Sequence, residues 1–319
     1  ETQEAPSLLD LNIGRGNNLE QVLSRFSQRK QRISTGLKEL DDCLGGGIEE
    51  GLTILAAKPG IGKTTLALQM AEYFSLMGYQ TIYFSNDMAV EELVAKSISR
   101  HSFEIAKNGA LTAEMVLYRE RLDGNAIEIW KQACERCREH TQNLRLVDVT
   151  QSIYIESVVD IFSSYLKSFG VTPILIIDYL QKMGSKNAQP SKDKERLDYL
   201  AEMLKTASML NHLPIIAVST IHRGAYDRSL TLDALKESGG LEYNADRVIG
   251  LQPKGIGKPD FDPEKMKGPY REMELVILKN RFGMADVSVP VRFYPAYNVF
   301  MCETKVPKMK MTEPPKVRR

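Results

Sequence analysis

The segment from Ala57 to Thr64 has the spacing of glycine, lysine and threonine that is typical of a phosphate-binding P-loop, or Walker A motif. It follows an apolar run expected to form a strand and precedes a stretch expected to form a helix, which disfavours a chance match. Backbone N–H groups of such a loop hold a triphosphate, its lysine (Lys63) reaches the β- and γ-phosphates, and its threonine hydroxyl (Thr64) is a ligand of Mg²⁺. The residues expected to bind ATP are Pro59, Gly60, Ile61, Gly62, Lys63, Thr64 and Thr65.

An apolar run that ends in a carboxylate supplies a second part of this site. Residues 174–177 read Ile-Leu-Ile-Ile and are followed by Asp178. A buried parallel strand with this pattern delivers its aspartate to the edge of the sheet where nucleotides and Mg²⁺ bind. The pattern is weak by itself, but together with the upstream P-loop it predicts that Thr64 and Asp178 are the metal ligands.

A third group, Asp87, is a candidate for the carboxylate that positions or deprotonates the attacking water. It comes just after the expected strand Thr81–Ser85, so in a parallel sheet it would face the P-loop from the end of an adjacent strand. Asp87 could instead, or in addition, cap the helix expected to begin near Val90. Glu91 and Glu92, one turn further on, compete for the catalytic role, for which we favour Asp87.

The elements that must position these residues follow an alternating pattern from Ile33 onward. Short apolar runs alternate with helical stretches, which is typical of an α/β fold with a parallel sheet. Strands are expected at Leu52–Ala57, Thr81–Ser85, Leu144–Val147, Pro173–Ile177 and Pro214–Ser219. Helices are expected at Thr64–Met77, Val90–Arg100, Ile155–Phe169 and Lys194–Leu210. After Tyr243 the pattern predicts an antiparallel extension. Its strands are expected at Arg247–Leu251, Glu272–Leu278, Val287–Phe293 and Val299–Cys302.

The two ends of the chain differ from this central domain, which is expected to span residues 33–304. Residues 1–32 are expected to be a linker with a short amphipathic helix at 17–30. Its apolar stripe consists of Leu19, Val22, Leu23 and Phe26. The sequence leaves open whether this helix packs on its own domain or on a neighbouring subunit. Residues 305–319 are rich in proline and basic side chains and are expected to be a disordered tail.

The composition excludes several classes of protein. The 319 residues include 43% hydrophobic and 26% charged side chains, which excludes a disordered chain or a small disulfide scaffold. No apolar run is long enough to span a bilayer, so no membrane partner is expected.

The four irregularly placed cysteines indicate reduced thiols and a cytoplasmic location. Cys134, Cys137 and His140 lie in a helix-like stretch without a second ligand pair, so a zinc site is disfavoured. The net charge of +1 neither demands nor excludes a nucleic acid.

Short segments spread along residues 33–302 match, in order, those of a known family. They are Ser34–Asp41, Gly45–Gly47, the P-loop that begins with Ala57, Phe84–Met88, Asp178–Gln181, Lys236–Glu242 and Lys279–Arg281. On these segments the chain resembles the motor portion of the DnaB family of replicative helicases, in which alanine at the first P-loop position is itself typical. The resemblance implies a RecA-like P-loop NTPase core, with a mainly parallel twisted sheet flanked by helices and an antiparallel C-terminal extension. No segment resembles the family's N-terminal helical domain.

The resemblance also implies roles for four residues of the expected catalytic group. Asp87 stands where the family carries a catalytic glutamate. Thr220 stands where the family usually has the glutamine of a sensor motif, which relays the state of the γ-phosphate to the DNA-binding loops. Lys279 and Arg281 match residues that reach into the neighbouring subunit's nucleotide site and stabilise charge in the transition state. On sequence alone, a solvated strand edge before a turn is the alternative for Lys279 and Arg281.

Basic loops are expected to hold a single strand of DNA. The resemblance places residues 236–239 on a loop that lines a central channel. The stretch from Lys182 to Arg196 is basic and long enough to project, and a solvated charged surface is its alternative. Contacts led by phosphates would bind DNA without sequence preference. The expected DNA-binding residues are Lys236, Glu237, Gly239, Arg223, Lys182 and Lys186.

The expected function is that of an ATP-dependent DNA helicase motor. Its subunits would form a homo-oligomeric ring, expected to be a hexamer, hydrolyse ATP with Mg²⁺ at their interfaces, and move along single-stranded DNA to unwind the duplex during replication. The resemblance adds a primase and a helicase loader as partners. Two alternatives are open. One is a strand-exchange or clock-type (KaiC-like) relative of RecA. The other is an ATP-binding switch, loader or regulator that does not unwind DNA, which the residues at positions 87 and 220 keep open.

Overall fold

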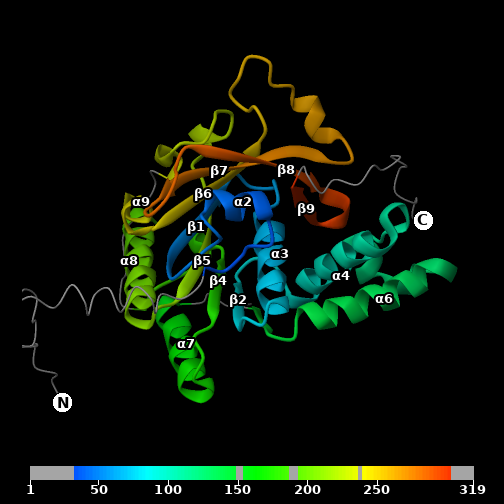
Figure 1. The fold of residues 1–319 in the computed structure, drawn as a ribbon, viewed down its shortest axis with the longest axis horizontal. Coiled ribbons are helices and arrows are strands. Elements are labelled where there is room, and N and C mark those ends of the chain that lie inside the picture. The colour runs from blue at the N-terminus through cyan, green and yellow to red at the C-terminus, as the bar shows by residue number, and fades with distance from the viewer. Residues whose placement is uncertain (1–31, 149–153, 187–192, 236–238, 303–319) are drawn as a thin grey trace, which may run out of the picture. The chain divides into compact units, whose positions relative to one another are not determined.

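A sheet of nine strands forms the centre of the part of the chain that the computed structural model describes, namely residues 32–148, 154–186, 193–235 and 239–302 (Figure 1). The strand order is β3-β2-β4-β5-β1-β6-β7-β8-β9. The parallel strands are β1 (Gly51–Ala57), β2 (Thr81–Ser85), β3 (Leu144–Asp148), β4 (Ile174–Asp178), β5 (Pro214–Thr220) and β6 (Arg247–Pro253). The antiparallel strands are β7 (Arg271–Asn280), β8 (Val287–Tyr294) and β9 (Val299–Cys302).

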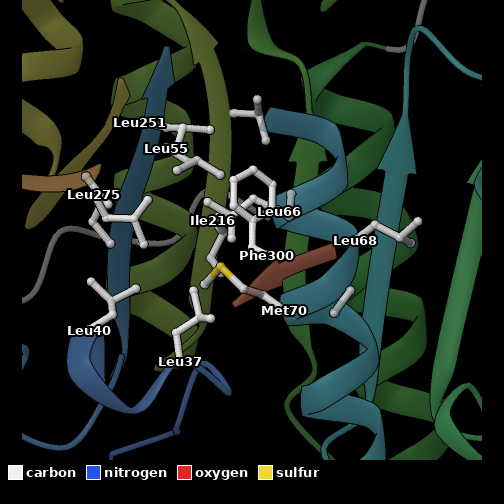
Figure 2. Packing of buried hydrophobic residues seen from close by; sticks show 14 of the residues in the cluster. Leu37, Leu40, Leu55, Leu66, Leu68, Met70, Ile216, Leu251, Leu275 and Phe300 are labelled. Atoms are coloured by element: carbon white, nitrogen blue, oxygen red, sulfur yellow. The ribbon is translucent and has the colours of Figure 1, made fainter. Parts of the chain in front are cut away.

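Both faces of the sheet are covered by helices, which explains why its strands have nearly continuous apolar sequences. In β4, Ile174 and Ile176 pack on one side with α2 (Lys38–Cys43) and α3 (Lys63–Leu76). Leu175 and Ile177 pack on the other side with α7 (Ile155–Phe169) and α8 (Asp193–Asn211). Figure 2 shows the first of these clusters, in which side chains from α2, α3 and β9 point toward one another. The helices are α2 (Lys38–Cys43), α3 (Lys63–Leu76), α4 (Val90–Ala106), α5 (Ala113–Leu117), α6 (Gly124–His140), α7 (Ile155–Phe169), α8 (Asp193–Asn211) and α9 (Gly239–Asn244).

The expected α/β architecture is confirmed, with one difference in the C-terminal extension. The strand expected at Arg247–Leu251 is β6, which pairs in parallel with β1 on one side and antiparallel with β7 on the other. It therefore ends the parallel part of the sheet and begins the antiparallel part. None of the helices in the described residues is long and apolar enough to cross a membrane.

Buried ion pairs join the P-loop helix α3 to α4. The guanidinium of Arg100 on α4 lies 2.6 Å from the Glu72 carboxylate on α3, and both side chains are only 2% exposed. The ring of His101 lies 3.2 Å from the same carboxylate. Burial would raise the pKa of Glu72, but Arg100 and His101 together hold it below its usual value. Removing one partner from such a buried group is costly, so α4 is firmly attached to the helix that follows the P-loop.

Candidate nucleotide site

The P-loop connects the end of β1 to the start of α3, as its sequence predicts. Gly62 has φ of +107°, and a Cβ at this position would lie 2.9 Å from the ring of Phe300 and 3.1 Å from that of Phe293. The two rings are stacked with their centroids 4.3 Å apart. Only glycine fits here, because any side chain would meet both a left-handed backbone and this aromatic pair. The P-loop therefore packs at Gly62 against the aromatic side chains of the antiparallel strands β8 and β9.

Lys63, the lysine of the P-loop, is largely buried at the start of α3. Its ammonium donates a hydrogen bond to the carbonyl of Lys58, at 3.0 Å. Burial lowers the pKa of Lys63 to about 8, although the nearby carboxylates of Asp178 and Asp87 favour its charged form. The arrangement thus brings the Lys63 ammonium and two carboxylates to the same edge of the sheet.

Asp178 ends β4 and is only 2% exposed. Its Oδ2 accepts a hydrogen bond of 2.7 Å from the hydroxyl of Tyr83, whereas its Oδ1 has no hydrogen-bond partner among the described residues. Burial raises the pKa of Asp178, and the hydroxyls of Tyr83 and Thr64 and the charge of Lys63 offset only part of this rise. A buried carboxylate oxygen without a donor, beside a threonine hydroxyl, fits a hard cation such as Mg²⁺.

Asp87 lies just after β2, with its side chain 47% exposed, and its carboxylate contacts the ammonium of Lys182. The expectation that Asp87 caps α4 is not confirmed, because the N-cap residue of that helix is Ala89. The N–H of Ala89 donates to Oε2 of Glu92 at 3.0 Å. Glu92 is thus engaged at the helix terminus, and Asp87 is left at the strand edge, close enough to Lys63 to affect its pKa.

A role for Gln181 is not evident from the sequence, although the residue belongs to one of the matched segments. Its side-chain amide bridges the ends of β4 and β5: Nε2 donates to Oγ of Ser219 at 2.9 Å and to the carbonyl of Thr220 at 3.1 Å. Its Oε1 accepts from the N–H of Thr220 at 3.2 Å. Thr220 is therefore held through its backbone at the end of β5, which leaves a sensor role of its side chain as a prediction.

Arg281 and Lys279 are not brought to the P-loop of their own chain. The N–H of Arg281 donates to the carbonyl of Asp246, and the N–H of Asp246 donates to the carbonyl of Leu52, at the start of β1. The P-loop follows the other end of this strand, roughly 17 Å away at the rise of about 3.3 Å per residue of parallel strands. Lys279 donates to the carbonyl of Glu242 on α9, at 2.6 Å. Neither side chain completes the nucleotide site that lies within one chain.

Asp246 is a further anchor that no sequence pattern indicated, because its partners lie far away along the chain. Its carboxylate accepts hydrogen bonds from Lys205 at 2.7 Å and from the N–H of Leu52 at 2.9 Å, and it lies 3.2 Å from the guanidinium of Arg281. Burial would raise the pKa of Asp246, but the bonds from Lys205 and Leu52 hold it below its usual value. Asp246 thus fixes the base of the turn that carries Arg281.

The expected DNA-binding residues are placed only in part. Lys236 and Glu237 lie outside the described residues, as do the helix at 17–30 and the tail at 305–319, whereas Gly239 begins α9. Arg223 is exposed in a 3₁₀ turn that follows β5. Lys186 lies over the ring of Tyr154, at 5.6 Å.

The basic stretch from Lys182 to Arg196, which was expected to project, is described only at its two ends, because residues 187–192 lie outside the described residues. Lys182 closes a 3₁₀ turn (Leu180–Lys182), and α8 already begins at Asp193. Arg196 is turned inward, where its guanidinium donates to the carbonyls of Gln181 and Met183 at 2.9 and 2.8 Å. These carbonyls belong to the segment just after β4, so Arg196 holds in place the backbone that follows Asp178.

Comparison with known proteins identifies the family. The family described as the DnaB-like helicase C terminal domain matches residues 32–302. The chain belongs to this family. It is 24% identical over 311 residues to the replicative DNA helicase DnaC of Bacillus subtilis, covering 94% of this chain and 63% of that relative. The DnaB-like chain described here therefore spans less than two thirds of that relative's length.

Solved structures agree with the DnaB-like fold. One of them, described as an ATPase domain, has a TM-score of 0.74 at 22% identity, covering 89% of this chain and 96% of that one. A DnaB-like replicative helicase, whose structure was described with its interactions with primase, has the same TM-score and identity, covering 92% of this chain and 70% of that one. As a member of a RecA-type ATPase family, the chain is a nucleotide-binding protein.

Proposed function

We propose that this DnaB-like chain is the ATP-driven motor of a DNA helicase that acts in replication. One observation carries the proposal: Lys63, Thr64 and Asp178 lie together at one edge of the sheet, whereas Arg281 lies at the far end of β1 from them. An arginine there can reach a nucleotide only in a neighbouring copy. Hydrolysis that needs a neighbour is the behaviour expected of a ring of subunits, which we propose has six.

The proposed chemistry assigns a task to each residue of the site. The P-loop backbone and Lys63 hold the phosphates, and Thr64 and Asp178 hold Mg²⁺, which when bound neutralises charge on the β- and γ-oxygens. Asp87 positions or deprotonates the attacking water, and its exposure at the strand edge leaves it accessible to solvent. Arg281 and Lys279 of the next subunit then stabilise the charge that develops on the transferred phosphoryl group.

The related proteins are named replicative DNA helicases, which supports DNA as the substrate and replication as the process. We propose that the motor moves along single-stranded DNA. The structural neighbour described with its primase interactions supports a primase as a partner, and we propose a helicase loader and a cytoplasmic location as well. We propose that the loop at 236–239 binds the DNA phosphates, together with the side chains of Arg223 and Lys186. In the alternative, an ATP-binding regulator, the residues Asp87 and Thr220 would weaken turnover, so that the protein would bind ATP and DNA without moving along the DNA.

The first test is steady-state ATP hydrolysis over a titration of the protein, with and without single-stranded DNA. The Lys63→Ala variant serves as the blank, because it lacks the ammonium that holds the phosphates. Specific activity that rises with protein concentration and rises again with DNA supports the motor. Slow hydrolysis that DNA does not change, in a protein that binds ATP and assembles, would favour the regulator instead.

Binding of ATP is also expected to take up protons at alkaline pH. Because burial lowers the pKa of Lys63 to about 8, about three quarters of these lysines are neutral at pH 8.5 in the free protein. The phosphates favour the charged form, so ATP affinity falls as the pH rises through 8, and binding at pH 8.5 takes up about 0.75 proton. Calorimetry in buffers of different ionisation enthalpy measures this number. The Lys63→Arg variant, whose guanidinium stays charged, should show no uptake.

A further inference from the structure

The contact between Lys182 and Asp87 joins a predicted DNA-binding residue to the predicted catalytic carboxylate. Asp87 follows β2 and Lys182 follows β4, and these two strands are neighbours that end at the same edge of the sheet. The ammonium of Lys182 contacts Oδ1 of Asp87, and it also lies over the ring of Tyr179, 5.6 Å from its centroid. The Lys182 ammonium therefore contacts both a carboxylate and an aromatic ring of its own chain.

Such a pair restrains the carboxylate without burying it. A carboxylate that is held by an ammonium is turned away from other partners, including a water beside the γ-phosphate. Both side chains are 47% exposed, so the pair is weak and sensitive to salt. A polyanion can therefore compete for the ammonium, which an interior ion pair such as Arg100–Glu72 would not allow.

We propose that Lys182 restrains Asp87 in the free protein, and that a phosphate of single-stranded DNA releases this carboxylate by binding the Lys182 ammonium. Lys182 is then a positioning residue through which DNA stimulates ATP hydrolysis. The inference rests on the proposed function, since it takes Asp87 as the group that acts on water.

The test compares Lys182→Met with the wild-type protein in ATP hydrolysis without DNA. Exposed ion pairs change equilibria by up to about fivefold, so the variant is expected to hydrolyse ATP up to about five times faster than the wild type in the absence of DNA. Its stimulation by DNA should fall by the same factor. Lys182→Arg keeps a cation beside Asp87, so its rate without DNA should not rise as that of Lys182→Met does. Lys38→Met removes another exposed lysine–aspartate pair, that with Asp42 on α2, and should leave the rate unchanged.

Thermodynamic coupling gives a second readout that needs no turnover. If a DNA phosphate competes with Asp87 for the Lys182 ammonium, removing the Asp87 charge should strengthen DNA binding. Asp87→Asn should then bind single-stranded DNA up to about fivefold more tightly than the wild type in the absence of nucleotide. Fluorescence anisotropy with a labelled oligonucleotide measures this affinity.

The outcomes separate this inference from the proposed function. Lys182→Met could hydrolyse ATP at the wild-type rate without DNA and merely need a higher DNA concentration for stimulation. This result would overturn the proposal that Lys182 restrains Asp87, and Lys182 would then only contact DNA. An unchanged DNA affinity in Asp87→Asn would overturn it as well. Failure of the wild type itself to respond to DNA would instead count against the proposed function.

Discussion

Replacing Arg281 with alanine is expected to lower ATP turnover by a factor of at least about 10³, with little change in ATP affinity. The reason is that Arg281 lies at the opposite end of β1 from its own P-loop, so in the proposed ring it acts on the nucleotide of a neighbouring subunit. Steady-state hydrolysis and a separate measurement of ATP binding test the two parts of this expectation. Arg138→Ala, which removes an exposed arginine paired with Glu135 on α6, is the matched control and should be fully active.

Mixing two inactive variants distinguishes action on a neighbour from action within one chain. Arg281→Ala keeps an intact P-loop, whereas Lys63→Ala keeps an intact Arg281. In mixed rings, some P-loops of the first variant would face the arginine of the second, so activity should return. If the mixture stayed as inactive as its components, although it assembled, then Arg281 would not act between subunits.

Replacing Asp87 with asparagine is expected to slow turnover by a factor of about 10² to 10⁴, because the amide cannot accept a proton from water. Asp87→Glu should retain activity, since the longer side chain restores the residue type that the DnaB family carries at this position. Single-turnover hydrolysis of bound ATP isolates the chemical step from product release.

Controls for the Asp87 prediction come from the two neighbouring glutamates. Glu91→Gln and Glu92→Gln are expected to hydrolyse ATP at nearly the wild-type rate, because Glu92 accepts the N–H of Ala89 at the start of α4 and not a proton from water. The amide oxygen of glutamine at position 92 can still accept the N–H of Ala89, so the free energy of unfolding should change little. A large rate loss in Glu91→Gln together with an active Asp87→Asn would transfer the catalytic role to Glu91.

The sheet could be predicted from the sequence because burial on both faces makes its strands short, continuous apolar runs. The P-loop could be predicted because its function requires fixed residue types at fixed spacing along one segment. The same reasoning missed the contacts of Arg196, whose position in a basic stretch suggested a projecting loop but whose guanidinium binds two carbonyls behind the site.

Contacts between residues far apart in the chain could not be predicted in this way. Asp246 supports the turn that carries Arg281, and Lys182 pairs with Asp87, yet neither pair is marked by local spacing. Charged side chains on the surface look alike in a sequence, and only the order of the strands decides which of them meet. The sequence favours Asp87 over its neighbours because a residue just after a parallel strand lies at the edge where ligands bind, and its catalytic role stays a prediction.

The place of β1 in the sheet also constrains the order in which the molecule can fold. Gly51 pairs with Pro214 on one side, and Thr53 pairs with Arg247 on the other, so β1 has no strand partner until β5 has been made and is complete only with β6. A chain emerging from the ribosome must therefore keep this apolar segment unpaired through most of its synthesis, when it is prone to aggregation. Closing such long loops is slow, and ATP binds only after they have closed. The nucleotide can thus stabilise the finished domain but cannot assist the early stages of its folding.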